Sequence, residues 1–117
     1  MRLRTSLWLA VALASALFLT GCPSRTTINK IKGDPSRYEN KTVGIGGTVR
    51  DSYGLLNFGG AYEIEDETGR IWVVSRNRAV PSRGARVGVE GKVYSGLTFG
   101  GRNFAGPVIE ETDRRVK

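Results

Sequence analysis

Two glycine loops and the aromatic and arginine residues around them are the side chains best suited to chemistry in this sequence. The loops share the pattern Leu-x-Phe-Gly-Gly, at residues 56–60 and again at 97–101. Exposed rings can stack on a ligand, and arginines can pair with anionic groups. We therefore expect a binding groove, and its candidate contacts are Arg50, Tyr53, Phe58, Trp72, Phe99 and Arg102. The alternative is that Phe58 and Phe99 plug the ends of the core, since buried aromatics are common in small domains.

The groups that most enzymes use are missing from the sequence. It contains no histidine, its single cysteine is Cys22, and no serine stands in a recognisable nucleophile motif. An acidic run at residues 63–67 lacks the spacing of a calcium loop, and a solvated strand face explains it equally well. We therefore expect no enzyme activity, no metal site and no cofactor.

Residues 1–21 are typical of an export signal. Arg2 and Arg4 precede a run from Leu7 to Leu19 that is apolar apart from Ser15 and too short for a comfortable membrane span. The next residues complete Leu19-Thr20-Gly21-Cys22, which resembles the lipobox of bacterial lipoproteins. That resemblance implies a chain that begins at Cys22 and is held in the bilayer by acyl groups such as palmitate. The alternative is an ordinary signal peptide with a coincidental cysteine.

The residue after Cys22 bears on the address. It is Pro23 and not aspartate, so the resemblance to lipoproteins of two-membrane bacteria implies no retention at the inner membrane. If the source is a two-membrane bacterium, the expected location is the outer membrane, facing the periplasm. From Cys22 onward the chain has 16 Lys and Arg against 11 Asp and Glu, and it is therefore moderately basic.

The elements that position the candidate groove are short strands with alternating apolar residues. The pattern Val43-x-Ile45-x-Gly47-x-Val49 returns 44 residues later as Val87-x-Val89-x-Gly91-x-Val93. Between them lies a hairpin whose Glu67-Thr68-Gly69 turn leaves Trp72 facing outward. Adjacent glycines at 46 and 47 predict a bulge or sharp bend. One core should contain Val43, Ile45, Val49, Tyr62, Ile64, Ile71, Val73, Val87, Val89 and Val93.

The sequence predicts that the chain has four parts. Residues 1–21 form the signal peptide, 22–40 a lipidated tether with a short helix, 41–111 the strands, and 112–117 a basic tail that we expect to fray. Thr27 should cap the helix, Ile28 and Ile31 share one helix face, and residues 33–35 should end it. Tyr38 should pack below the strands, and residues 77–85 form a bare loop. The last two strands are expected at 86–94 and 107–111.

This order of elements resembles the OB-fold, an all-β, five-stranded Greek-key barrel. The residues that carry the resemblance are the two repeated strands and the hairpin Tyr62-x-Ile64-x-Asp66-x-Thr68-Gly69-x-Ile71-x-Val73. They resemble the nucleic-acid-binding OB domains related to the anticodon-binding modules of tRNA synthetases. The chain departs from that family by lacking a helix before its fourth strand. The resemblance implies a ligand face on the second and third strands, between the two glycine loops.

These observations favour a membrane-anchored, non-catalytic binding module for an envelope protein or glycan. Nucleic-acid binding is an alternative, supported by the basic charge and the rings but opposed by the export signal and by outward-facing Glu63 and Glu65. A structural subunit of an envelope complex is another. A basic loop at Arg76, Arg78, Arg83 and Arg86 could touch anionic lipid headgroups or simply keep the chain soluble.

Overall fold

A computed structural model describes residues 24–54 and 59–117. The expected signal peptide, Cys22 and Phe58 lie outside these ranges, so the structure does not address the predictions about them. No helix among the described residues is long and apolar enough to cross a membrane. Along the chain the elements are β1 (Ser24–Arg25), α2 (Ile28–Gly33), α3 (Pro35–Tyr38), β2 (Thr42–Gly54), β3 (Gly60–Glu65), β4 (Arg70–Ser75), β5 (Arg86–Phe99) and β6 (Arg102–Val116).

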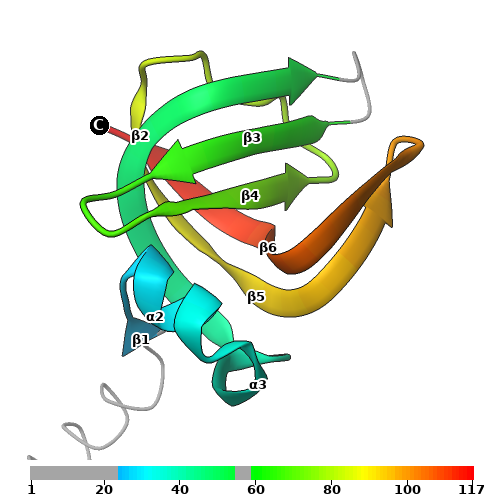
Figure 1. The fold of residues 1–117 in the computed structure, drawn as a ribbon. Helices are drawn as coiled ribbons and strands as arrows, with labels where there is room; N and C mark the ends of the chain where they lie inside the picture. Colours follow the sequence, from blue (N-terminus) through cyan, green and yellow to red (C-terminus); the bar gives the residue numbers. More distant parts are fainter. Residues whose placement is uncertain (1–23, 55–58) are drawn as a thin grey trace, which may run out of the picture.

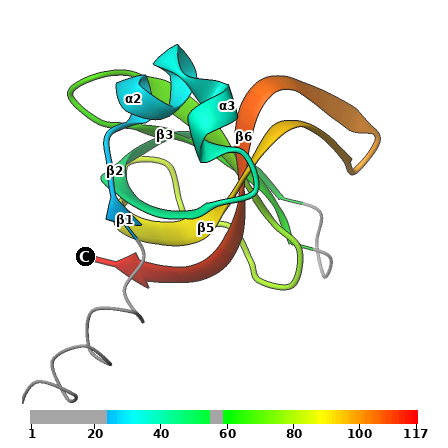
Figure 2. The ribbon, with the colours of Figure 1, turned by 90° about the horizontal axis from the view of Figure 1, so that it is seen from below.

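Five long strands pair into a sheet that closes on itself (Figures 1 and 2). Antiparallel pairs join β2 to β3, β3 to β4, β6 to β5 and β5 back to β2. A parallel pair joins β4 to β6. The remaining strand, the two-residue β1, pairs in parallel with the start of β2. The fold is therefore mostly β and OB-like, as the sequence predicts.

The inward-facing residues form the main core, because side chains alternate between the two faces of a strand. All ten residues expected in one core are buried together. They are joined by Ile28 and Ile31 from α2 and by Ile109 from β6. The predicted strand phase is confirmed.

The glycine pair in β2 is not the site of a bulge. Gly46 and Gly47 pair regularly with Gly88 and Val87, and the irregularity in β2 lies between Val49 and Asp51. The bulge predicted at residues 46 and 47 is therefore wrong, whereas the alternative, a bend that lets β2 serve two neighbours, agrees with the change of partner from β5 to β3 at Thr48. Gly47 is needed because a Cβ there would clash with the backbone carbonyl of Glu65, which passes directly beside β2.

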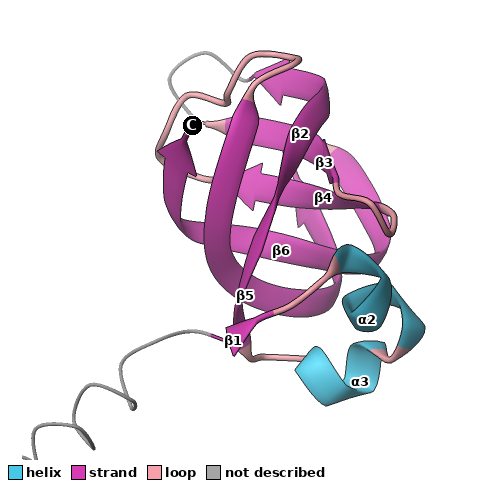
Figure 3. Cartoon of the chain, turned by 90° about the vertical axis from the view of Figure 1, so that its left-hand side faces the viewer, coloured by secondary structure: helices cyan, strands magenta, loops and turns pink. Residues whose placement is uncertain are grey.

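Helix α2 closes one end of the sheet, next to α3 and β1 (Figure 3). It starts after Thr27 as expected, but the Thr27 side chain makes no capping hydrogen bond. The β3–β4 turn caps the helix instead: the Ile28 N–H donates to Asp66 Oδ2 at 2.9 Å and the Asn29 N–H to Thr68 Oγ1 at 2.9 Å. A cap supplied by a distant turn cannot be recognised from local sequence.

The chain after α2 both departs from and agrees with expectation. Pro35 starts a second short helix, α3, that was not predicted, since proline suits the first helical position. Tyr38 packs against the core and residues 76–85 contain no helix, both as predicted.

The last two strands are longer than the sequence suggests. Residues 97–99 belong to β5, and Gly100 and Gly101 turn the chain with φ angles of 61° and 77°. β6 then runs to Val116, which pairs with Val87. The expected fraying of the basic tail is wrong, because its backbone is paired along β5. The outer part of this hairpin stands out from one side of the sheet, in orange in Figure 1.

Candidate functional site

A second apolar cluster lies on the outer face of β3 and β4. Its members come from β3, β4, β5 and β6, and the hairpin of β5 and β6 brings the last two strands over this face. We call this set the outer aromatic surface. Its buried members are Ala61, Val74, Phe104 and Val108, and its half-buried members are Trp72, Tyr94, Leu97 and Phe99.

Trp72 is at the centre of this surface. Its ring centroid lies 5.5 Å from that of Phe104, with the planes tilted by 50°. It faces outward, as predicted, but it is half-buried because the hairpin covers part of it. Tyr53 is 41% exposed and is paired across the strands with Ala61, so it continues the same face.

Two arginines lie over the rings. The Arg102 guanidinium carbon is 4.8 Å from the Trp72 centroid and 5.4 Å from the Phe104 centroid. The Arg76 carbon is 5.3 Å from the Phe99 centroid. A cation over an aromatic face is attracted to it, and each such contact is worth about 0.5–1 kcal/mol at an exposed site. Arg76 is paired with Glu110 at 3.0 Å, whereas Arg102 makes no ion pair among the described residues. The surface therefore presents the Arg102 cation beside its rings, which suits a partner with both apolar and anionic groups.

The structure brings together most of the candidate residues. Trp72, Phe99 and Arg102 belong to one surface, and Tyr53 adjoins it. Phe58 lies outside the described residues, so the expected pairing of two rings across a groove is not addressed. Phe99 is half-buried, so its burial is intermediate between the two alternatives that the sequence allowed, an exposed ring and a ring buried in the core.

Arg50 does not join the outer aromatic surface. Its Nη2 lies 3.0 Å from Glu65 Oε1, beside a polar pocket near the helix end of the sheet. Arg50 lies at the irregularity of β2 between Val49 and Asp51, toward the end of β3 that carries Glu65 and away from the Tyr53–Ala61 pair. Asp51 pairs with Arg83 at 3.0 Å, and this hydrogen bond from Arg83 lowers the pKa of Asp51.

The outward-facing carboxylates of β3 are neutralised by arginines. Arg70 pairs with Glu65 and lies 3.6 Å from Glu63, while Arg50 contacts Glu65 from β2. The hydrogen bond from Arg70 lowers the pKa of Glu65, so this carboxylate stays ionised within the pair. Their repulsion of an anionic ligand is accordingly smaller than their charges in the sequence suggest.

Glu111 forms a polar link inside the closed sheet that sequence reasoning missed. Its side chain is 3% exposed, accepts hydrogen bonds from Tyr62 and Ser75, and pairs with Arg114 at 3.1 Å. Burial of the hydroxyl is the main cause that raises the pKa of Tyr62, and the hydrogen bond to the Glu111 carboxylate is the second. Tyr62 therefore stays protonated and remains a hydrogen-bond donor. Arg114 also donates to the Ala79 carbonyl at 2.7 Å and holds the 76–85 loop against β6. All these groups have partners, which indicates a structural role.

The fold of this chain is similar to parts of solved structures, as the following comparisons show. No family model matches the sequence, and no curated protein matches it. Among solved structures, an aspartyl-tRNA synthetase from Leishmania major matches 82% of this chain with a TM-score of 0.63 and 9% identity. The asparaginyl-tRNA synthetase of Pyrococcus horikoshii matches 78%, with a TM-score of 0.60 and 20% identity. That of Entamoeba histolytica, in complex with asparaginyl-adenylate, matches 81%, with a TM-score of 0.57 and 16% identity.

This chain spans 21%, 22% and 24% of the length of those three proteins. At such identities the likeness shows a shared fold and not a shared activity. The resemblance to a part of the tRNA synthetases, expected from the repeated strands and the hairpin, is confirmed at the level of fold.

Proposed function

We propose that this chain is a non-catalytic binding module, held at a membrane surface by acyl groups on Cys22, that binds an envelope protein through the outer aromatic surface. The observation that carries the proposal is the position of that surface, with Arg102 over two of its rings, on the face where OB folds take ligands. Protein interfaces are enriched in aromatic residues and arginine, which favours a protein partner over a glycan.

Acylation of Cys22 supplies the membrane attachment in this proposal. The Leu19–Cys22 motif after an apolar run supports it. Each buried methylene contributes about 0.8 kcal/mol, and two or more chains give firm anchoring where one is marginal. Because Pro23 follows the cysteine, the proposed location is the outer membrane facing the periplasm.

Photo-crosslinking in intact cells tests the partner surface. A photoreactive residue at Thr98, which is exposed in β5 between Leu97 and Phe99, should capture a protein. The matched position is Ser36, exposed on α3 at the helix end of the sheet, and it should capture none. Adding Arg102→Ala should reduce capture at Thr98 at least tenfold in a protein that stays folded, because Arg102 is exposed and its two ring contacts are together worth only about 1–2 kcal/mol.

Other outcomes of this experiment contradict the proposal. Capture of glycan at Thr98 would replace the protein partner, and strong capture at both positions would indicate a structural subunit packed on all sides. Capture at Thr98 that Arg102→Ala leaves unchanged would show that the partner does not use the cation over the Trp72 ring.

Single-stranded nucleic acid is a second candidate, favoured by two observations. The fold is shared with part of the tRNA synthetases, and Glu63 and Glu65 are paired with arginines. Stacking of a base on an aromatic side chain is worth about 1–3 kcal/mol in single-strand binders. Fluorescence anisotropy with labelled oligo-uridine and oligo-thymidine decides the matter. Binding that weakens steeply between about 50 and 200 mM salt supports this candidate, and no binding at the lower concentration excludes it.

A further inference from the structure

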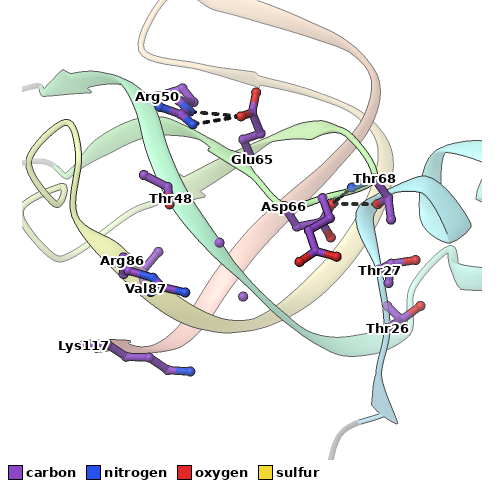
Figure 4. Close-up of a pocket in the computed structure, with 13 residues that line it drawn as sticks. Thr26, Thr27, Thr48, Arg50, Glu65, Asp66, Thr68, Arg86, Val87 and Lys117 are labelled. Carbon is purple, nitrogen blue, oxygen red and sulfur yellow. Dashed lines mark hydrogen bonds and ion pairs between the residues drawn. The ribbon is translucent and has the colours of Figure 1, made fainter.

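A polar pocket of about 580 Å³ lies away from the outer aromatic surface, near α2. Thr26 and Thr27, which join β1 to α2, line one side of it, and Arg86 at the start of β5 and Lys117 after the end of β6 line the other (Figure 4). Gly46 and Gly47 of β2 also line it. Its size is within the range of small-ligand sites, about 300–1,000 Å³. The proposed function does not involve this pocket.

The charges that line the pocket fall into two groups. Arg50 and Glu65 neutralise each other, and Asp66 is engaged by the N–H groups of Ile28, Thr68 and Gly69. Three further lining residues, Arg86, Lys117 and Glu67, make no ion pair within the part of the chain that the structure describes. These three are the charges open to a ligand.

The free charges are separated by sign. Arg86 and Lys117 lie together on one side of the pocket, where β5 begins and β6 ends. Glu67 directly follows Asp66, which lies on the opposite side with Thr27 and Thr68. A ligand that spans the pocket would therefore place an anionic group beside the two cations and a cationic group beside Glu67.

The cationic side fits a phosphate better than a carboxylate. Arginine presents a planar fork of donors that matches phosphate oxygens, and lysine adds a compact charge. The hydroxyl of Thr48, which also lines the pocket, makes no hydrogen bond within the described part of the chain. A phosphodiester offers more acceptor oxygens to this set of donors than a carboxylate does.

The position of the pocket indicates where such a ligand comes from. Thr26 lines it and is held by a hydrogen bond of its N–H to the Gly44 carbonyl at 3.0 Å. Cys22 precedes Thr26 by four residues, which span about 14 Å at most when fully extended. An acyl group on Cys22 would thus keep the pocket close to lipid headgroups.

We propose that the pocket binds a zwitterionic phosphoethanolamine headgroup, with its phosphate at Arg86 and Lys117 and its ammonium at Glu67. The assignment to membrane lipid rests on the proposed acylation of Cys22, whereas the recognition of the headgroup does not. The module would then bind its partner through the outer aromatic surface and the membrane lipid through this pocket.

Titration of the purified full chain with glycerophosphoethanolamine tests the recognition. We expect one saturable site, weakened at least tenfold by the double substitution Arg86→Gln and Lys117→Gln. The matched control, Lys32→Gln with Arg37→Gln, removes the same charge from exposed positions on α2 and α3 and should change affinity less than twofold. Absence of a saturable site, or equal loss in both double variants, overturns the proposal.

Two further measurements test whether Glu67 binds the ammonium group and whether the ligand lies against Gly46. Glu67→Gln should weaken glycerophosphoethanolamine at least threefold and leave inorganic phosphate unaffected; equal effects on both ligands overturn the zwitterionic assignment. Gly46→Leu should block binding, because a Cβ at Gly46 meets its nearest neighbour, the Val87 carbonyl oxygen, only at 3.7 Å. Retained binding in a folded Gly46→Leu protein contradicts the placement in this pocket.

Reconstituted protein distinguishes lipid from a free headgroup. In vesicles of phosphatidylethanolamine the pocket should already be occupied, because a primary ammonium donates hydrogen bonds to the Glu67 carboxylate and the quaternary ammonium of phosphatidylcholine does not. Added glycerophosphoethanolamine should therefore bind at least fivefold more weakly than in vesicles of phosphatidylcholine. Equal affinity in the two vesicles overturns the lipid source. If Cys22 carries no acyl group but the titration in solution succeeds, the anchoring proposal fails and the headgroup site stands.

Discussion

The Tyr62 hydroxyl donates a hydrogen bond to the Glu111 carboxylate inside the closed sheet. The two residues belong to β3 and β6, which are not neighbours in the sheet. The same carboxylate accepts from Ser75 and pairs with Arg114. One buried group thus ties together β3, the end of β4 and the last strand.

Glu111→Ala should be strongly destabilising, because it leaves Arg114 without its partner in a largely buried position. Breaking one side of a buried ion pair costs about 3–5 kcal/mol. Tyr62→Phe, which removes only the hydroxyl, should cost about 1–2 kcal/mol. Urea unfolding of the two variants measures both values, and equal small losses would show that the network contributes little.

The Tyr62 link also predicts alkaline sensitivity. The pKa of Tyr62 is raised on folding, so the folded state holds its proton more tightly than the unfolded state. Its stabilising contribution is complete below the ordinary tyrosine pKa of about 10 and is lost as the pH rises above that value. Between about pH 8 and pH 11 the melting temperature should fall by more in the parent protein than in Tyr62→Phe. Parallel curves for the two proteins would contradict this prediction.

Asp66→Ala should loosen α2, because Asp66 accepts hydrogen bonds from the Ile28 N–H and from its own turn at Thr68 and Gly69. Loss of a helix cap costs about 0.5–2 kcal/mol. Glu67→Ala, one residue away and exposed, is the matched control and should leave the free energy of unfolding within about 0.5 kcal/mol. Hydrogen exchange of the α2 amides would locate the effect.

Asp66 further predicts reduced stability in acid. Burial acts to raise the pKa of Asp66, but the hydrogen bonds from Thr68, Ile28 and Gly69 prevail and the pKa is lowered. The carboxylate therefore contributes its stabilisation above the ordinary aspartate pKa of about 3.9 and loses it as the pH falls through the lower folded value. The parent and Asp66→Ala should converge in stability in strong acid, and a constant difference at every pH would contradict this.

Gly47→Ala and Gly46→Ala form a matched pair in β2. At Gly47 the added methyl would clash with the Glu65 carbonyl, whereas at Gly46 it meets ordinary contacts. Forced overpacking costs about 1–3 kcal/mol, so Gly47→Ala should lower the free energy of unfolding by that amount and Gly46→Ala by much less. Equal stability of the two variants would show that β3 does not approach β2 as closely at this point.

Mass spectrometry of the mature N-terminus tests the proposed anchor. We expect a chain that begins at Cys22 and carries a diacylglycerol mass, and Cys22→Ser should abolish incorporation of labelled palmitate. A mature chain that starts at another residue, or an unmodified Cys22, would show that the Leu19–Cys22 motif is coincidental. The remaining fold is not expected to depend on this group, because the core residues within the described part of the chain lie between Ile28 and Ile109.

Local sequence determined the inward face of the strands. Apolar residues at every second position of β2, β3, β4 and β5 must share one face, since successive side chains of a strand point to opposite sides. The same alternation placed Trp72 outside, and Ile28 and Ile31 could be assigned to one helix face by their spacing. The repeated strands with the hairpin between them were enough to indicate an OB-like fold.

Tertiary structure alone decided what covers the outer face and what fills the inner polar positions. Trp72 is half-buried because the β5–β6 hairpin carries Phe104 back over it, and the sequence contains no local signal for that return. The Glu111 network and the Asp66 cap join residues 49 and 38 positions apart. Alternation along a strand reports which face a side chain takes, but the partner it meets depends on long-range pairing, and only the closed sheet brings such residues together.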